Sequence, residues 1–427
     1  MTTGSGESGG NPRLLQFGAG KIGRSFIGQL FSRAGYEVVF VDVADALVRA
    51  LNERRSYRVV IKDVVEEEIW VEHVRAIHAG DTEAVAREIA GAAIAATAVG
   101  PAFIASVFPL LAAGLLRRRA ANGGALDVII CENVLHGARL FRDGLKPLLL
   151  ADYPFDDLVG LVETSIGKMV PLMPEAERDP LLVYAEAYNT LIVDRKAFKR
   201  GVPDVSGIEA KDNMAAYVDR KLFIHNLGHT VAAFLQYLLH PDQPYIWQAM
   251  ADPEVRGATE AAMWESGRAL IGRYPDEFNE ANQREAIEDL LQRFANRALG
   301  DTVYRVGRDL PRKLSAADRF INALRMDREQ NVDAPYTELG LAAGLLFRAT
   351  DQQGRLFDAD ARFVAEVYAQ GVNYVLQTVC GLNLADPADR AVAERVRLAH
   401  DFLADPQRRR TPWLAAFHRR GLEAFRP

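Results

Sequence analysis

Near its amino end the chain reads RLLQFGAGKIGR over residues 13–24 and YEVVFVD over residues 36–42. The first segment predicts a short strand that ends at Gly18, a tight turn, and a helix that begins near Gly23. The second segment predicts another strand, which ends at Asp42. A strand, a glycine-rich turn, a helix and a second strand in this order are typical of the opening unit of a doubly wound parallel sheet.

The spacing of the glycines predicts a dinucleotide site. Gly18 allows the tight turn, Gly20 lets the main chain approach a pyrophosphate, and Gly23 permits close packing of the helix on the sheet. The free N–H groups at the start of the helix attract phosphates. Asp42 would accept hydrogen bonds from the ribose hydroxyls and repel a 2′-phosphate, which favours NAD over NADP. We therefore expect the cofactor to contact Gly18, Ala19, Gly20, Lys21, Ile22, Gly23 and Asp42.

Arg24 stands directly after the turn. It could approach a phosphate, including the 2′-phosphate of NADP, but the simpler expectation is an exposed side chain in the first turn of the helix.

Length and composition describe an ordinary globular chain. With 427 residues it exceeds what one hydrophobic core usually organises, so two domains are expected. The net charge of -6 argues against nucleic-acid binding, which needs a basic face. Only Cys131 and Cys380 are present, too few for a disulfide framework or a cysteine zinc site, and this usage fits a reducing cytoplasm. We expect no apolar run long enough to cross a bilayer, hence no membrane partner.

The order of the segments predicts an α/β fold: a Rossmann-type doubly wound sheet with extra strands, followed by a mostly α-helical C-terminal domain. The expected parts are a flexible leader at residues 1–12, an NAD-binding domain at 13–210, and a substrate and catalytic domain at 211–427.

Within the first domain we expect buried strands at 92–99 and 127–131 and a helix at 102–119. A two-stranded β-ribbon is expected from 57–61 and 68–74, and further strands within 160–193 that extend the sheet. The carboxyl ends of parallel strands gather ligands. The segments expected beside the cofactor are therefore Val99-Gly100-Pro101 and Cys131-Glu132-Asn133.

The segment 212–229 predicts one helix that carries a catalytic set. At about 100° per residue, Asn226 lies about 140° from Lys221, and His229 lies between them at about 80°. Lys221 would be the base that removes a proton from a secondary alcohol, if burial lowers its pKa. Asn226, together with Asn133, would donate to the developing oxyanion. His229 would hold a neighbouring substrate hydroxyl.

The pattern Lys221-x4-Asn226-x2-His229, joined to the glycine turn, resembles the polyol-specific long-chain dehydrogenase/reductase family, also called the mannitol dehydrogenase family. Its members interconvert sugar alcohols and ketoses without zinc. Segments 97–101, 131–133, 220–223 and 312–315 are most similar to members that act on mannitol 1-phosphate, and the similarity runs from about residue 13 to 382. The resemblance implies reversible NAD-dependent oxidation of a sugar alcohol phosphate, D-mannitol 1-phosphate to D-fructose 6-phosphate, with Lys221 as general acid/base and no catalytic metal.

The chain departs from these relatives at two places, a tail at 383–427 and His225, which stands four residues after Lys221. His225 would disturb the base or the substrate, or else be a hydrogen-bonded histidine at the helix surface. Two alternatives stay open. One is a relative that acts on an unphosphorylated polyol or a hexuronate such as tagaturonate or fructuronate, and the other is a catalytically silent NAD-sensing protein.

A substrate phosphate would need cations, and Arg matches its oxygens best. The expected substrate-binding residues are Arg308, Arg312, Lys313 and Arg348, unless they pair with Asp301, Asp309 or Asp318. The histidines lack the spacing of metal ligands. We expect a small-molecule polyol or sugar phosphate as the partner, no nucleic acid, a cytoplasmic location, and a monomer or weak homo-oligomer.

Overall fold

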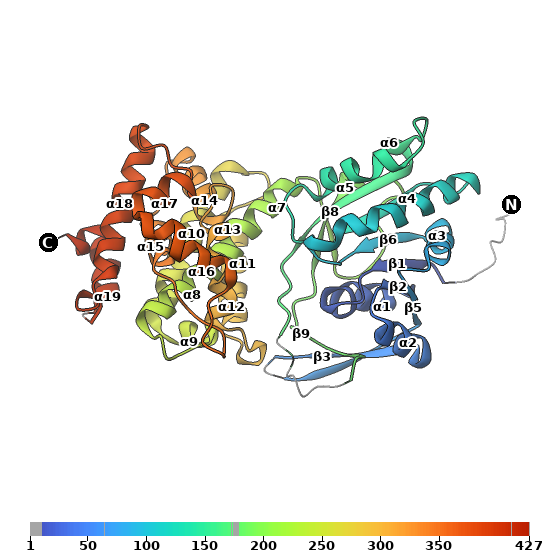
Figure 1. The fold of residues 1–427 in the computed structure, drawn as a ribbon, viewed down its shortest axis with the longest axis horizontal. Helices are drawn as coiled ribbons and strands as arrows, with labels where there is room; N and C mark the ends of the chain where they lie inside the picture. The colour runs from blue at the N-terminus through green and yellow to red at the C-terminus, as the bar shows by residue number, and fades with distance from the viewer. Residues whose placement is uncertain (1–10, 64, 172, 174–178, 411, 427) are drawn as a thin grey trace. The chain divides into compact units, whose positions relative to one another are not determined.

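The structure is a computed structural model that describes residues 11–63, 65–171, 173, 179–410 and 412–426. Except for Asn11 and Pro12, the predicted leader lies outside these residues. The chain divides into two compact units, Met1–Met214 and Ala215–Pro427 (Figure 1).

The first unit is built on an eight-stranded sheet with the order β11-β10-β8-β7-β6-β1-β2-β5. The strands from β8 to β5 in this order are all parallel, whereas β10 is antiparallel to β8. The predicted Rossmann-type sheet with extra strands is confirmed. The strands are β1 (Arg13–Phe17), β2 (Glu37–Asp42), β5 (Val74–His78), β6 (Ile94–Thr97), β7 (Leu126–Ile130), β8 (Val159–Ile166), β10 (Leu191–Asp194) and β11 (Ile208–Lys211).

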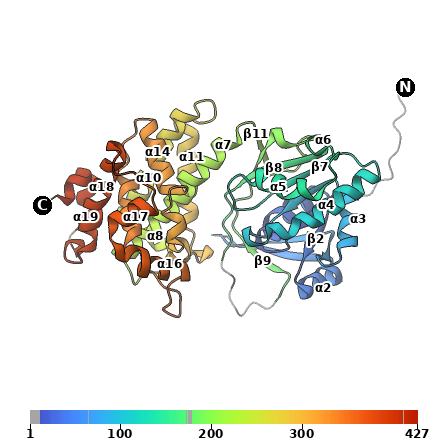
Figure 2. The ribbon, with the colours of Figure 1, turned by 45° about the horizontal axis from the view of Figure 1, so that its top comes forward.

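Helices cover both faces of this sheet because its strands are apolar on both sides (Figure 2). In β1, Leu14 belongs to the core under one set of helices and Leu15 to the core under the other. The first set is η1 (Gly23–Gly28), α1 (Gln29–Arg33) and α2 (Asp45–Arg54), and the second is α3 (Thr82–Gly91), α4 (Ile104–Ala120) and α5 (Gly137–Leu145). The strand order reverses between β1 and β6, so ligands are expected at the carboxyl ends of these two strands.

Shorter helices complete the first unit: η2 (Pro101–Phe103), η3 (Lys146–Leu148), α6 (Phe155–Leu158) and η4 (Arg195–Ala197). The helix Pro101–Ala120 is long and apolar enough to span a bilayer by length and composition, so the expectation that no run reaches this length is wrong. Its apolar side chains, such as Ile104 and Leu111, pack in the core of the unit against the sheet. Core packing therefore accounts for its composition.

Two strand predictions in the first unit are wrong. The β-ribbon forms from β3 (Ser56–Ile61) and β4 (Glu67–Glu72), but its second strand does not continue to Val74. His73 has a φ of 57°, which turns the chain, and Val74 begins β5 in the main sheet instead. The prediction of further strands within 160–193 that extend the sheet holds for β8 and β10, but not for β9 (Leu182–Ala185), which pairs with β3 in a separate sheet of order β4-β3-β9.

The second unit is mostly helical, as predicted. Its central helix runs through α7 (Met214–Arg220), η5 (Lys221–Asn226) and α8 (Leu227–Leu239). Against α8 pack α10 (Pro253–Arg273), α12 (Val303–Gly307) and α15 (Pro335–Leu345). The other helices are α9 (Ile246–Ala251), α11 (Glu280–Phe294), η6 (Arg297–Leu299), α13 (Leu310–Lys313), α14 (Arg319–Glu329), α16 (Asp358–Arg362), η7 (Phe363–Val367), η8 (Tyr368–Gln370), α17 (Val372–Thr378), α18 (Pro387–Ala404), η9 (Arg408–Arg410), α19 (Trp413–Arg420) and η10 (Gly421–Phe425).

The tail after residue 382 is part of this packed unit. Helix α18 lies against α15, and Arg395 on α18 donates through Nε to both carboxylate oxygens of Glu338 on α15, at 2.8 Å each. Two more carboxylates, Glu265 and Asp327, are buried near this pair, and the charge of Glu338 acts on both of them. Burial raises the pKa of Glu265 and of Asp327 to about 8. Asp327 has no hydrogen-bond partner for its carboxylate among the residues described.

Candidate active site

The glycine turn connects β1 to the helix that begins with η1, and each glycine meets a different steric demand. Gly18 has a φ of 87°, and a Cβ on it would collide with the carbonyl of Ala98. A Cβ on Gly23 would collide with the carbonyl of Gly18. A Cβ on Gly20, by contrast, would meet no atom within 4 Å. The open space is therefore above Gly20, where a pyrophosphate could approach the main chain.

Asp42 closes the turn from the end of β2. Its Oδ2 accepts a hydrogen bond from the N–H of Ala19 at 2.7 Å, and its Oδ1 accepts one from Ala44 at 2.9 Å. The carboxylate is thus fixed at the edge of the turn and remains partly exposed, as is Ile22, and Lys21 is exposed. An open cradle beside a fixed carboxylate fits the phosphates and ribose of a dinucleotide.

Arg24 does not lie in solvent, so the expectation of an exposed side chain is wrong. It is 8% exposed; its Nε donates to the carbonyl of Ala19 at 2.7 Å and one terminal nitrogen donates to that of Pro180 at 2.6 Å. Tyr57 also donates its hydroxyl to the carbonyl of Arg24. The guanidinium therefore braces the turn from within the first unit.

A second loop, after β6, is held by Glu132, whose role the sequence analysis missed. The carboxylate of Glu132 accepts hydrogen bonds from Val99 at 2.8 Å and from Gly100 at 2.9 Å. Gly100 has a φ of 91°, a conformation that favours glycine. Asn133 follows Glu132 in the chain and is exposed. An acidic residue directly after a buried strand was the available signal for this contact.

In the second unit the three predicted catalytic side chains lie on one helix, but this helix is not regular. Residues Lys221–Asn226 form a π turn, in which the N–H of Leu227 bonds to the carbonyl of Leu222, five residues earlier. In such a turn the backbone bonds join residues five apart, so each residue turns by less than the 100° of an α-helix. Lys221 and Asn226 therefore lie closer to one face than the predicted 140° separation, which assumed a regular α-helix.

Lys221 lies beside a buried arginine that the sequence did not single out. Burial, assisted by the charge of Arg319, lowers the pKa of Lys221 to about 8. Arg319 donates to the carbonyl of Asn226 at 3.0 Å and to the hydroxyl of Thr230 at 2.9 Å, and it pairs with Asp318 at 2.8 Å. Arg319 thus fixes the π turn and keeps the lysine amine less basic.

His229 contacts two residues that sequence reasoning also missed. Its ring stacks on Phe294, with centroids 4.4 Å apart and an interplanar angle of 10°. Its Nε2 lies 3.1 Å from Oδ2 of Asp301, whose Oδ1 accepts a hydrogen bond from Nε of Arg305 at 2.6 Å. Burial lowers the pKa of His229, whereas the pairing of Asp301 with His229 and Arg305 outweighs burial and lowers the pKa of that carboxyl.

His225 is buried between the same elements, so the expectation of a surface histidine is wrong. Its ring centroid lies 5.7 Å from that of Phe294 and 6.1 Å from that of His229. Burial, and then the charge of Arg293, lowers the pKa of His225 well below its usual value. The ring is therefore a neutral wall of the site near neutral pH.

The four cations expected to bind a substrate phosphate have different surroundings. Arg312 is exposed and pairs with Asp309 at 2.5 Å and with Asp318 at 3.0 Å. These ion pairs are the alternative to phosphate binding that the sequence left open. Lys313 is buried and donates to the carbonyl of Arg308, and burial lowers its pKa to about 7.

Arg308 and Arg348 face aromatic rings. The guanidinium of Arg308 lies 5.4 Å from the ring centre of Tyr304, and that of Arg348 lies 4.6 Å from Tyr368. Arg348 also donates to the carbonyl of Phe347 at 2.6 Å. Neither arginine has a carboxylate partner among residues 11–63, 65–171, 173, 179–410 and 412–426.

The site residues thus belong to two units. The first unit brings together the glycine turn, Asp42 and the loop held by Glu132, and it carries Asn133. The second unit brings together Lys221, Asn226 and His229. Among the described residues no group of three or more His, Cys, Asp or Glu side chains is placed to hold a metal ion. The absence of a catalytic metal stays a prediction.

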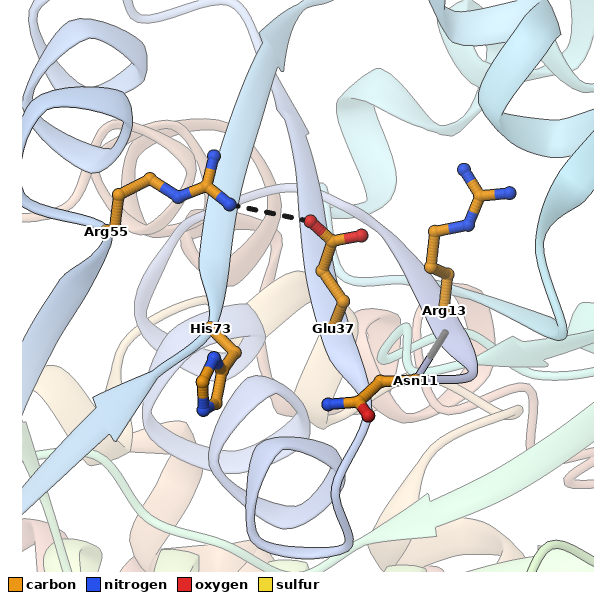
Figure 3. Close-up of a pocket in the computed structure, with 5 residues that line it drawn as sticks. All are labelled: Asn11, Arg13, Glu37, Arg55 and His73. Carbon is orange, nitrogen blue, oxygen red and sulfur yellow. Dashed lines mark ion pairs between the residues drawn. The ribbon is translucent and has the colours of Figure 1, made fainter. Parts of the chain in front are cut away.

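A pocket in the first unit lies at the opposite ends of the strands, where β1 and β2 begin (Figure 3). Figure 3 shows Arg55 directed toward Glu37, which it pairs with at 3.6 Å. Arg13 pairs with Glu88 at 2.8 Å. These arginines are occupied by ion pairs at the amino ends of the strands, away from the glycine turn, so the candidate site is not here.

Comparison with known proteins gives matches over both units. Residues 12–207 match the family model of the mannitol dehydrogenase Rossmann domain, and residues 213–379 match that of the mannitol dehydrogenase C-terminal domain. A mannitol-1-phosphate 5-dehydrogenase of Brevibacillus brevis is 36% identical over 386 residues, which cover 90% of this chain and 97% of that protein. One from Geobacillus stearothermophilus is 36% identical over 337 residues, covering 78% and 87% respectively.

Two solved structures share the fold. The mannitol 2-dehydrogenase of Pseudomonas fluorescens, in a ternary complex with NAD and D-mannitol, has a TM-score of 0.75 at 17% identity and covers 96% of this chain and 95% of its own. A substrate-free D-sorbitol dehydrogenase has a TM-score of 0.73 at 16% identity and covers 98% of this chain and 95% of its own.

Proposed function

Because the chain belongs to the mannitol dehydrogenase family, as its motifs predicted, we propose that it is an NAD-dependent dehydrogenase that reversibly oxidises D-mannitol 1-phosphate to D-fructose 6-phosphate. The observation that carries the proposal is the set on the central helix of the second unit. Lys221, with a pKa lowered to about 8, shares the π turn with Asn226 and stands two turns before His229.

Lys221 takes the proton in the alcohol-oxidising direction. A pKa of about 8 leaves roughly a tenth of the amine neutral at pH 7, far more than for an ordinary lysine, so the side chain can accept the hydroxyl proton and return it in the reverse direction. NAD, when bound, supplies the acceptor for the hydride of the same carbon. Asn226 donates its amide N–H groups to the oxygen as negative charge develops, and the proposal gives Asn133 the same role. His229 holds a neighbouring hydroxyl and so orients the carbon chain.

The glycine turn and Asp42 support NAD as the cofactor. The main chain at Gly20 is open, and Asp42 is held by Ala19 and Ala44 with its charge at the edge of the turn. A fixed negative charge there favours ribose hydroxyls and repels a 2′-phosphate. Arg24, the nearby cation, is committed to the carbonyls of Ala19 and Pro180. We therefore expect a preference for NAD over NADP.

The basic segment that begins at α12 supports a phosphorylated substrate. Arg308 is half-buried and has no carboxylate partner among the described residues, and Lys313 is close enough to Arg319 to feel its charge, as Lys221 is. Arg312 is the weaker candidate because Asp309 and Asp318 already bind its guanidinium. We assign the phosphate to Arg308 and Lys313, with Arg348 as a further cation.

Initial rates with NAD and NADP test the proposal across mannitol 1-phosphate, glucitol 6-phosphate, mannitol and arabinitol, with fructuronate and tagaturonate reduction measured using NADH. The highest kcat/KM is expected for mannitol 1-phosphate with NAD. A higher value for a free polyol or a hexuronate would assign the chain to the unphosphorylated branch of the family. No turnover with any substrate, despite NAD binding by calorimetry, would favour the NAD-sensing alternative.

A further inference from the structure

A buried carboxylate stands behind the proposed substrate-binding histidine. Oδ2 of Asp301 lies 3.1 Å from Nε2 of His229, and neither atom has a hydrogen-bond partner elsewhere among the described residues. The side chains are 6% and 13% exposed. The contact is not aligned as a linear hydrogen bond. Because the two atoms are close and bond to nothing else described, each is the polar neighbour of the other.

Two contacts fix the direction of this pair. Arg305 donates to Oδ1 of Asp301, so that the other oxygen, Oδ2, faces the histidine. Phe294 stacks on the imidazole with nearly parallel planes, which holds the plane of the ring. The histidine can therefore change the position of its proton more readily than the position of its ring.

The charge on Asp301 then determines which ring nitrogen carries the proton. A carboxylate only accepts hydrogen bonds, and a neutral imidazole has one N–H donor and one bare acceptor nitrogen. Resting on the proposed function, we propose that Asp301 is a positioning residue that holds the His229 proton on Nε2 and presents the bare Nδ1 to a substrate hydroxyl. This hydroxyl is then the donor, and its orientation selects the substrate carbon that lies beside Lys221.

An Asp301→Asn variant tests the tautomer directly. Because Arg305 donates to the position of Oδ1, the amide oxygen should face Arg305 and the amide nitrogen should face His229. Nε2 must then accept, and the proton moves to Nδ1. Nitrogen NMR of histidine-labelled full-length protein distinguishes the two tautomers, and a His229→Gln variant identifies the His229 signals. We expect the Nε2–H form in the natural protein and the Nδ1–H form in the variant.

Kinetics tests whether the tautomer matters for substrate. With one substrate hydrogen bond misdirected, kcat/KM should fall about tenfold. Most of this loss should appear in KM, because the hydroxyl held by His229 does not react. The matched control is Asp252→Asn, which changes a second His–Asp pair, His240 Nε2 to Asp252 Oδ2 at 2.8 Å, and keeps a side chain that caps α10. It should leave kcat and KM unchanged.

The outcomes separate this inference from the proposed function. An Nδ1–H or a doubly protonated His229 in the natural protein, or a tautomer that Asp301→Asn leaves unchanged, overturns the positioning role whatever the activity. A reversed tautomer with unchanged KM also overturns it. If the natural protein shows the Nε2–H form but oxidises no polyol phosphate, the proposed function fails and the tautomer assignment stands.

Discussion

The proton affinity of the Lys221 amine is lowered by burial and by one charged neighbour. Burial removes water from the ammonium group, and the charge of Arg319 adds repulsion, so both lower its pKa, to about 8. Lowering the pKa of a base increases the fraction that is neutral at a given pH and decreases the affinity of each amine for a proton. A value close to the working pH balances these two effects.

The pH dependence of turnover should follow from this value. Oxidation needs the neutral amine and reduction needs the ammonium form, so kcat should rise with pH for oxidation and fall for reduction, each with a midpoint near pH 8. Lys221→Met should lose about 10²–10⁴-fold in kcat and lose this dependence. Rates that stay constant from well below to well above pH 8 in the natural protein would remove Lys221 as the proton carrier.

Gly20 should matter for the cofactor and not for the fold. A Cβ at this position meets no protein atom within 4 Å, so Gly20→Ala should leave the melting temperature unchanged, but it should occupy the space assigned to the pyrophosphate. We expect the Kd for NAD to rise at least about tenfold, the cost of one lost main-chain hydrogen bond to a charged group. Gly124→Ala, at another open position, is the control and should leave both quantities unchanged. An unchanged Kd in Gly20→Ala would place the phosphates elsewhere.

The conformational needs of single residues were predictable, and their distant partners were not. The positive φ of Gly18 and the contact of Gly23 with the carbonyl of Gly18 follow from the tight turn itself, which is encoded within a few residues. Arg24 was expected in solvent because nothing nearby in the sequence announces Pro180, 156 positions away, as its acceptor. In the same way Asp301 has an ordinary sequence context, and only the fold brings it to His229.

At the scale of the element, the π turn η5 determines which side chains share a face. It holds one more residue than a regular helical turn, which turns Lys221 and Asn226 closer to one face than a regular α-helix would. Arg319 stabilises the turn by binding the carbonyl of Asn226. The shared face of the proposed catalytic residues is therefore a property of a π turn and not of regular helical periodicity.

Deleting Leu222 should test this account of the turn. The loss of one residue lets the helix return to regular α geometry, in which Asn226 and His229 stand four and seven residues after Lys221, about 40° and 20° from it, so the three side chains keep one face. We therefore expect the deletion variant to retain its helical circular-dichroism signal and measurable turnover. Asn226→Ala, which keeps the turn and removes the amide, should lower kcat about 10²–10³-fold. A larger loss in the deletion variant than in Asn226→Ala would show that the π turn does more than bring these side chains to one face.

Helices and strands were predictable where the local sequence pattern determines them. The partner of a strand in a sheet was not predictable in this way. The β-ribbon follows from alternating β-branched and charged residues, and β3 and β4 form it. The same pattern does not say which sheet a strand joins. For this reason β9 was expected in the main sheet, but it pairs with β3. A π turn leaves no mark on hydrophobic periodicity, because its residues Phe223 and Ile224 are as buried as those of a regular core helix.

At the scale of the whole molecule, the tail contributes charge neutralisation as well as packing. Helix α18 covers α15, and Arg395 supplies the counter-charge of Glu338, which is 1% exposed. Length and composition predicted two domains. They could not reveal this cluster, because Glu265, Asp327 and Glu338 stand on three different helices.

Arg395→Met should destabilise the second unit. Only Glu338 is buried, whereas the Arg395 side chain is 41% exposed, so water screens part of the loss and removing the guanidinium should cost about 1–3 kcal/mol. Chemical denaturation monitored by tryptophan fluorescence should show this loss, and it should be smaller in acid, because burial raises the pKa of Glu338 and the carboxyl is then neutral. Arg390→Met, at an exposed position of the same helix, is the control and should change stability by less than about 0.5 kcal/mol. Equal effects of the two substitutions would contradict this role of Arg395.

The buried carboxyl groups of Asp327 and Glu265 also couple the folding of the second unit to proton uptake. With their pKa values raised to about 8, Asp327 and Glu265 hold protons in the native state that the unfolded chain, with values of 3.8 and 4.5, has already released at neutral pH. Folding near pH 7 thus takes up hydrogen ions from the buffer. By linkage, the stabilisation from these two groups is complete in acid and declines as the pH rises toward 8. An alkaline pH therefore destabilises the same unit whose proposed catalytic lysine it deprotonates.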